Sequence, residues 1–299
     1  MKATRDSKTL VTFWGTRGSI STPGRMTEKY GGNTPCVSVR NGDNIIILDA
    51  GTGIRNLGIE LVDEMKQHDD GLQLHLFLSH THWDHIQGLP FFQPAYIQGF
   101  SLSIYGSPNK ERFLASILKD QMDYDYFPVA MSALTADINI HEISKDEIRI
   151  GPVVVDWQEQ VCHPGGSVRY RMSVGGKKIV YATDVELDAF LGGEESRSDT
   201  ESLAEEYMAF IHGADLLVAD GQYTGEEYPH KKGWGHTSLP VLLDAVAKSF
   251  VKQIAVFHHD PQHSDKFLDE LWMKHRTGYR SESHEMELFW AREGLTLAV

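Results

Sequence analysis

Short apolar runs separated by turn residues recur through the first part of the chain. Leu10–Gly15, Val37–Arg40 and Ile45–Leu48 are rich in β-branched and aromatic residues, so each predicts a strand. Asn41-Gly42-Asp43-Asn44 joins the last two runs and is typical of a hairpin turn. A helix is expected to follow over Ile54–Gln67.

The pattern continues with a buried strand over Leu72–Leu78, which ends sharply. Further strands are predicted over Leu102–Tyr105, Ile138–Ile143, Val153–Trp157 and Val168–Val174. A short helix is expected over Ile86–Phe92, and another helix is expected to begin at Ser107-Pro108. The acidic stretch Gly192–Glu206 is expected to be a solvated loop that leads into a helix. No repeat, low-complexity tract or linker divides the chain, so a single domain over residues 1–299 is expected.

Four side chains that can hold a metal ion follow the strand that ends at Leu78. They are His80, His82, Asp84 and His85. Imidazole and carboxylate both suit zinc and similar cations. One tetrahedral ion uses at most four ligands, and the histidines downstream add more, so this surplus predicts two metal ions side by side. The alternative, a polar loop with scattered histidines, fits this spacing poorly.

Later strands also end in His or Asp. The strand-end residues are His163, Asp184, Asp220 and the pair His258-His259. Four such ends predict that they share one rim of a sheet, although a strand-end Asp alone commonly caps a helix. The same two alternatives apply to Asp49, which either orients a ligand histidine or caps the helix that follows it.

From Phe13 to Asp260, the order and type of these residues resemble the metallo-β-lactamase superfamily of binuclear metallohydrolases. The resemblance implies an α/β fold, the four-layered αββα metallo-β-lactamase sandwich. It implies that His80, His82 and His163 hold one metal ion, that Asp84, His85 and His258 hold the other, and that Asp184 bridges the two. His259 is the alternative to His258, which is preferred because it directly follows the apolar run. The expected cofactors are two divalent ions, with Zn²⁺ first and Mn²⁺ or Fe²⁺ as alternatives.

The segment Gly233-Trp234-Gly235-His236-Thr237-Ser238-Leu239 points to the chemistry. It resembles the Gly-His-Ser-Thr element of ribonuclease Z and its phosphodiesterase relatives, with Thr and Ser exchanged. The resemblance implies that His236 contacts the scissile phosphate and donates a proton, so His236 and Asp84 are the candidate catalytic residues. The alternative is that Thr237 or Ser238 caps a helix and that His236 is incidental.

Two features favour a small substrate over a long nucleic acid. His163 and Asp184 are 21 positions apart, which leaves room for one hairpin but not for the RNA-gripping arm of ribonuclease Z. The formal net charge is −14, and such a surface repels polyanions. We therefore expect hydrolysis of a small phosphodiester, a cyclic nucleotide among the candidates, by a hydroxide held between the metals. The alternatives are a ribonuclease Z-like RNA-processing nuclease and a thioester or lactone hydrolase at the same binuclear site.

Composition limits the setting of the protein. No apolar stretch approaches the roughly 18 residues of a membrane span, and no secretory signal is visible at the N-terminus. The two cysteines, Cys36 and Cys162, are too few for a disulfide framework. A cytoplasmic protein without membrane association is expected, and the resemblance adds a homodimer as a common state among relatives.

Overall fold

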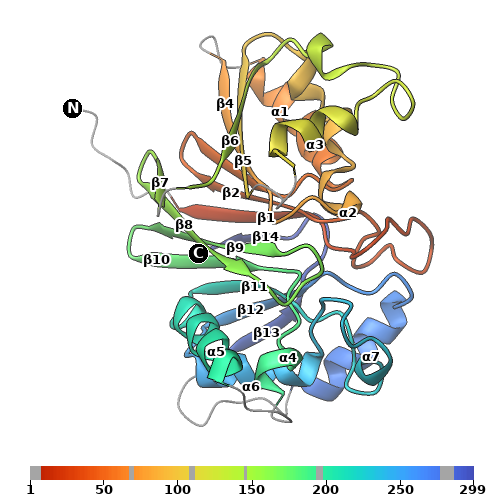
Figure 1. Cartoon of the computed structure of the whole chain (residues 1–299), viewed down its shortest axis with the longest axis vertical. Helices are drawn as coiled ribbons and strands as arrows, with labels where there is room; N and C mark the ends of the chain where they lie inside the picture. Colours follow the sequence, from red (N-terminus) through yellow and green to blue (C-terminus); the bar gives the residue numbers. More distant parts are fainter. Residues whose placement is uncertain (1–7, 67–70, 108–111, 145–146, 193–197, 277–285) are drawn as a thin grey trace. The chain divides into compact units, whose positions relative to one another are not determined.

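The computed structural model describes residues 8–66, 71–107, 112–144, 147–192, 198–276 and 286–299 (Figure 1). The chain divides into two compact units. The first unit comprises Met1–Pro23, Gly31–Asp146 and Arg292–Ala298, and the second comprises Gly24–Tyr30, Glu147–Ala291 and Val299. The expectation of a single domain over residues 1–299 stays a prediction.

The first unit is built on a seven-stranded sheet of order β14-β1-β2-β3-β4-β5-β6. Its strands are β1 (Thr9–Gly15), β2 (Cys36–Asn41), β3 (Asn44–Leu48), β4 (Leu72–Phe77), β5 (Phe100–Gly106), β6 (Asp137–Glu142) and β14 (Thr296–Ala298). The pairs β14–β1, β1–β2 and β2–β3 are antiparallel, whereas the pairs β3–β4, β4–β5 and β5–β6 are parallel. The predicted hairpin is confirmed, because Asn41 pairs with Asn44 across the turn.

Helix α1 (Ile54–Met65) connects two parallel strands of this sheet, β3 and β4. Its buried residues Ile54, Leu57, Gly58 and Leu61 recur at the spacing of one helix face, so that face packs on the apolar core. The other helical segments of the unit are α2 (Trp83–Ile86), η1 (Leu89–Phe91), η2 (Gln93–Tyr96), α3 (Leu114–Asp120) and η3 (Met131–Ala133).

The second unit has its own seven-stranded sheet, of order β13-β12-β11-β10-β9-β8-β7. Its strands are β7 (Glu147–Ile150), β8 (Val153–Gln160), β9 (Ser167–Val174), β10 (Lys177–Ala182), β11 (Leu216–Asp220), β12 (Gln253–Phe257) and β13 (Glu287–Trp290). Strands β7 to β10 are antiparallel, and β10 to β13 are parallel. Every residue of β11 is buried, as expected for a parallel strand covered on both faces.

Helical segments connect strands β10 to β13 of this sheet. They are α4 (Asp188–Leu191), α5 (Ser198–Ile211), η4 (Tyr228–His230), α6 (Leu239–Lys248) and α7 (Asp265–His275). Helix α6 follows β11 and precedes β12, and it buries Leu239, Leu242, Leu243 and Val246 in the core. Polar residues that follow β10, β11 and β12 are therefore collected at the carboxyl ends of parallel strands, where α/β sheets commonly bind ligands.

The predicted α/β class and most predicted strands are confirmed, with shifted ends. The short helix expected over Ile86–Phe92 is instead α2 followed by the 3₁₀ turn η1, and part of the acidic loop expected over Gly192–Glu206 is helix α5, which begins at Ser198. Gln67, Pro108 and residues 193–197 lie outside the described residues, and the first helix described after Ser107 begins at Leu114. Among the described residues, no helix has the length and apolarity needed to cross a membrane.

Adjacent residues of β4 provide a test of how the first unit is stabilised. Leu74 is fully buried in the core, and its neighbour Gln73 is exposed on the same strand. We predict that Leu74→Ala lowers the free energy of unfolding by about 2–5 kcal/mol, through lost burial and the cavity left behind. The Gln73→Ala control is expected to change it by less than about 0.5 kcal/mol. Urea unfolding followed by circular dichroism measures both, and equal destabilisation by the two variants would contradict the assignment of this core.

Candidate functional site

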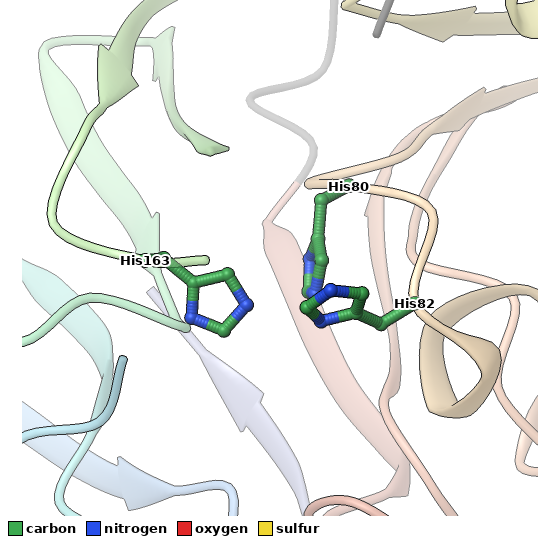
Figure 2. A group of neighbouring side chains, drawn as sticks. All are labelled: His80, His82 and His163. Atoms are coloured by element: carbon green, nitrogen blue, oxygen red, sulfur yellow. The ribbon is translucent and has the colours of Figure 1, made fainter. Parts of the chain in front are cut away.

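The predicted ligands of the first unit lie together on the loop between β4 and α2. Figure 2 shows the rings of His80 and His82 next to each other, with centroids 4.4 Å apart. The ring of His85 lies 4.2 Å from that of His80, and its Nε2 atom is 3.3 Å from Oδ2 of Asp84. These three contacts link the four side chains of the motif into one cluster.

Asp49 orients this cluster. Its carboxylate accepts hydrogen bonds from the backbone N–H and the hydroxyl of Ser79, at 2.7 and 2.8 Å. Nδ1 of His85 is 2.8 Å from the same carboxylate and donates to it. Helix α1 begins after Gly53 and has no side-chain cap, so the alternative that Asp49 caps this helix is wrong. The Asp49 carboxylate therefore fixes the orientation of the His85 ring.

A further contact in this unit was not apparent from the sequence. The backbone N–H of Ser19 donates to Oδ2 of Asp84 at 2.8 Å. Ser19 lies 65 positions before Asp84 and has a φ of 63°, in the left-handed region. The loop after β1 therefore fixes the orientation of a predicted ligand.

In the second unit, three histidines surround Asp184. Oδ1 of Asp184 is 4.0 Å from Nε2 of His163, 3.5 Å from Nε2 of His258 and 3.8 Å from Nδ1 of His236. All four residues are buried. His163, the third side chain drawn in Figure 2, lies on the turn between β8 and β9. The predicted strand-end residues of this unit are thus brought together around one carboxylate.

Hydrogen bonds fix which ring nitrogen of His163 and of His258 faces Asp184. Nδ1 of His163 is 2.9 Å from the carbonyl oxygen of Gly235, and Nδ1 of His258 is 2.7 Å from Oε1 of Gln222. Both partners only accept, so each Nδ1 donates and each Nε2 presents a lone pair. Each Nε2 lone pair faces an oxygen of the Asp184 carboxylate at 3.5–4.0 Å. The lone pair and the oxygen repel each other unless a cation or a proton lies between them. This donor set fits a divalent metal ion, and the hydrogen bond of each Nδ1 atom fixes the orientation of its ring.

The geometry also separates His258 from His259. His258 directs Nε2 towards Asp184, whereas Nε2 of His259 is 2.8 Å from the carbonyl oxygen of Ala291 and donates to it. Both rings are buried. His258 is therefore the histidine of this pair that lies in the Asp184 cluster.

Three residues of these clusters have unusual backbone conformations. Asp49, Asp184 and His258 each follow a strand and have φ values of 61, 56 and 60°. Residues with a Cβ rarely adopt this left-handed region, and such strain gathers at functional sites. The turn at each strand end directs its side chain into the cluster of its own unit.

Asp220 holds His236. Nδ1 of His236 is 2.7 Å from Oδ2 of Asp220, and the ring stacks on that of His258 with centroids 4.9 Å apart. Asp220 also accepts a hydrogen bond from the backbone N–H of Gln222, the residue that orients His258. The strand-end position of Asp220 was visible in the sequence, but its partner was not. Gln222 gave no signal there.

The alternative that a hydroxyl caps α6 is wrong for both candidates. Ser238 occupies the N-cap position without a side-chain cap, and its Oγ donates instead to Asp188 at 2.6 Å. Thr237 donates to the carbonyl oxygen of Val185 and accepts from the backbone N–H of Leu187. These bonds tie the segment after His236 to the segment after β10. Burial raises the pKa of Asp188, partly offset by its bonds from Ser238.

Glu186 organises the loop that precedes His236. Its buried carboxylate accepts hydrogen bonds from the backbone N–H groups of Gly233 and Gly235 and from the Tyr228 hydroxyl. Burial raises the pKa of Tyr228, and the bond to Glu186 raises it further, so this hydroxyl remains a donor. Burial and the Glu186 charge likewise raise the pKa of Cys162, which is a free thiol, as is Cys36.

Comparisons with known proteins find similar sequences and folds. The chain is 26% identical to ribonuclease Z of Pyrococcus horikoshii, with 87% of this chain and 89% of that protein covered. The metallo-beta-lactamase fold protein YhfI from Bacillus subtilis is similar in structure, with a TM-score of 0.65 at 16% identity over 97% of this chain and 99% of that one. Yeast PDE1 also has a TM-score of 0.65 at 16% identity, over 98% of this chain and 100% of that one.

These likenesses confirm the predicted metallo-β-lactamase sandwich fold. The family model described as the beta-lactamase superfamily domain matches residues 44–259, which include every predicted ligand. Because this match covers more than half of the sequence, the chain belongs to the beta-lactamase superfamily.

Proposed function

We propose that this protein is a metal-dependent phosphodiesterase that hydrolyses a small phosphodiester, with cyclic nucleotides as the first candidates. The observation that carries the proposal is the buried His236, held by Asp220 beside Asp184 and His258. A similar protein from Pyrococcus horikoshii is named ribonuclease Z, an activity on phosphodiester bonds. A proposed metal-ligand set beside a candidate proton donor supports this function.

The proposed metal centre would use residues from both clusters described above. One ion would be held by His80, His82 and His163, the other by Asp84, His85 and His258, with Asp184 shared between them. When bound, two divalent cations lower the pKa of a shared water and offset negative charge on a phosphate. Zn²⁺ suits these nitrogen and oxygen donors best, with Mn²⁺ or Fe²⁺ as alternatives.

His236 has the supporting contacts of a proton donor. Asp220 fixes its Nδ1 proton and stabilises the positive charge of the doubly protonated ring, as a carboxylate does in a catalytic triad. The Nε2 proton can then be transferred to the leaving oxygen. Asp84, held by Ser19, is the second proposed catalytic residue and would contact the reacting water.

An RNA-processing nuclease is the second candidate, favoured by the name of the Pyrococcus relative. The segment between His163 and Asp184 opposes it. This segment contains β9 and β10, joined by the two-residue turn Gly175-Gly176, and holds no inserted arm. The net charge of −14 also disfavours RNA, so the small substrate is preferred. A thioester or lactone hydrolase is the third candidate, because the same metals can polarise a carbonyl.

A turnover screen tests the proposal. The metal-loaded protein is given bis(4-nitrophenyl) phosphate, 2′,3′- and 3′,5′-cyclic nucleotides, a precursor transfer RNA, a thioester and a lactone. We predict hydrolysis of the small phosphodiesters and loss of that activity after dialysis against a chelator. Turnover of the transfer RNA alone would favour the second candidate, and no phosphodiester turnover by protein with its full metal content would overturn the proposal.

His236→Ala is the control that separates phosphodiester from acyl chemistry. Loss of a general acid is expected to lower kcat on a cyclic nucleotide about 10²–10⁴-fold, with metal content unchanged. If the third candidate is correct, this variant keeps nearly all of its lactone or thioester turnover.

The two ends of β11 provide a matched pair for the role of Asp220. Asp220 ends the strand beside His236, whereas Asp215 precedes it and accepts a hydrogen bond from Lys252. We predict that Asp220→Asn lowers kcat at least about 10-fold and leaves KM within about 2-fold, because His236 loses its orientation and its charge partner. Asp215→Asn is expected to retain the wild-type kcat. Steady-state kinetics on one cyclic nucleotide measures both, and equal losses would show that Asp220 contributes only to folding.

A further inference from the structure

Trp234 is an exposed aromatic residue at the start of the predicted catalytic segment. Its side chain is 58% exposed, although indole is among the side chains that gain most from burial. Gly235 and His236 follow it in the sequence. The carbonyl oxygen of Gly235 accepts a hydrogen bond from His163. The indole is therefore presented to solvent within two residues of the proposed proton donor.

The loop that presents Trp234 is held firmly in place. The glycines on either side of it have φ values of 82 and 85°, and the N–H groups of both donate to the buried carboxylate of Glu186. A Cβ on Gly235 would lie only 2.3 Å from Nδ1 of His163. The backbone at Trp234 is thus held in place beside residues of the proposed site.

Lys231 lies against the indole. Its Nζ atom is 4.1 Å from the centroid of a Trp234 ring. The backbone N–H of Trp234 donates a hydrogen bond to the carbonyl oxygen of Lys231 at 3.1 Å. An exposed cation–π pair contributes little by itself. The pair nevertheless combines a flat apolar surface with a compact positive charge, and these groups bind a nucleobase and a phosphate, respectively.

We propose that Trp234 and Lys231 form a platform that recognises a nucleotide, with the indole stacked on the base and the ammonium group near a phosphate. This inference rests on the proposed function, which it deepens by naming the substrate class. Stacking tolerates any base, so the platform selects nucleotides over phosphodiesters without a base and does not select among bases.

The test compares ligands with and without a base. Calorimetry measures the binding of adenosine 5′-monophosphate and of ribose 5-phosphate to the metal-loaded protein. Kinetics compare 2′,3′-cyclic AMP with the 2′,3′-cyclic phosphate of methyl ribofuranoside. Trp234→Ala is expected to weaken AMP binding and to lower kcat/KM for cyclic AMP roughly 10- to 100-fold, with an effect under about 3-fold on the ligands without a base. Trp234→Phe should restore most of the loss.

Two controls match these variants. Phe250, which is 50% exposed in the same unit and contacts His212, gives Phe250→Ala as a control for loss of an exposed ring. Lys231→Met should weaken AMP and ribose 5-phosphate binding alike, because it removes a charge and keeps the apolar stem. Lys232→Met, at the neighbouring exposed position, should bind both as the wild type does.

Failure of the platform is distinguishable from failure of the proposed function. Equal effects of Trp234→Ala on ligands with and without a base, or no effect, would overturn the platform while hydrolysis of cyclic phosphates continued. Base-dependent loss of AMP binding in a protein that hydrolyses none of these substrates would support the platform and contradict the phosphodiesterase.

Discussion

The hydrogen bonds made by the Nδ1 atoms of the clustered histidines are the interaction on which the candidate site depends. In the first unit, Asp49 holds His85, and in the second Gly235, Gln222 and Asp220 hold His163, His258 and His236. Each acceptor fixes the tautomer and the direction of one ring. Without these bonds the rings would have more rotational freedom, and binding a cation would cost more side-chain entropy. With them, the donor atoms are arranged before any cation arrives.

The backbone makes this arrangement available because parallel strands end at a common edge. In the second unit Asp184 and His258 follow β10 and β12, and Asp220 is the last residue of β11. The chain turns sharply at Asp184 and at His258. Left-handed backbone at an Asp or His is unfavourable, and the buried core around these strands compensates for it. The fold thus stabilises a local conformation that the isolated sequence would avoid.

Much of this organisation could be predicted from the sequence. The His-x-His-x-Asp-His spacing, the strand-end residues and the short His163–Asp184 segment are local patterns, and the structure places each as a strand-end or loop feature. The supporting contacts were less accessible, because Ser19 meets Asp84 across 65 positions and Gln222 meets His258 across 36. Such pairs depend on tertiary packing rather than on local pattern. The edge strands β7, β13 and β14 were also missed, since short strands carry little periodicity.

Metal stoichiometry tests most directly whether these side chains together hold two divalent ions through a shared Asp184. Protein reconstituted with zinc and freed of excess metal is measured by elemental analysis beside Asp184→Asn and the control Asp215→Asn. We predict about two ions per chain for the wild type and Asp215→Asn, and at most about one for Asp184→Asn, because an amide is a weaker ligand than a carboxylate. Folded wild-type protein that binds no zinc, or an Asp184→Asn variant that keeps both ions with unchanged affinity, would show that these residues do not form a two-ion site.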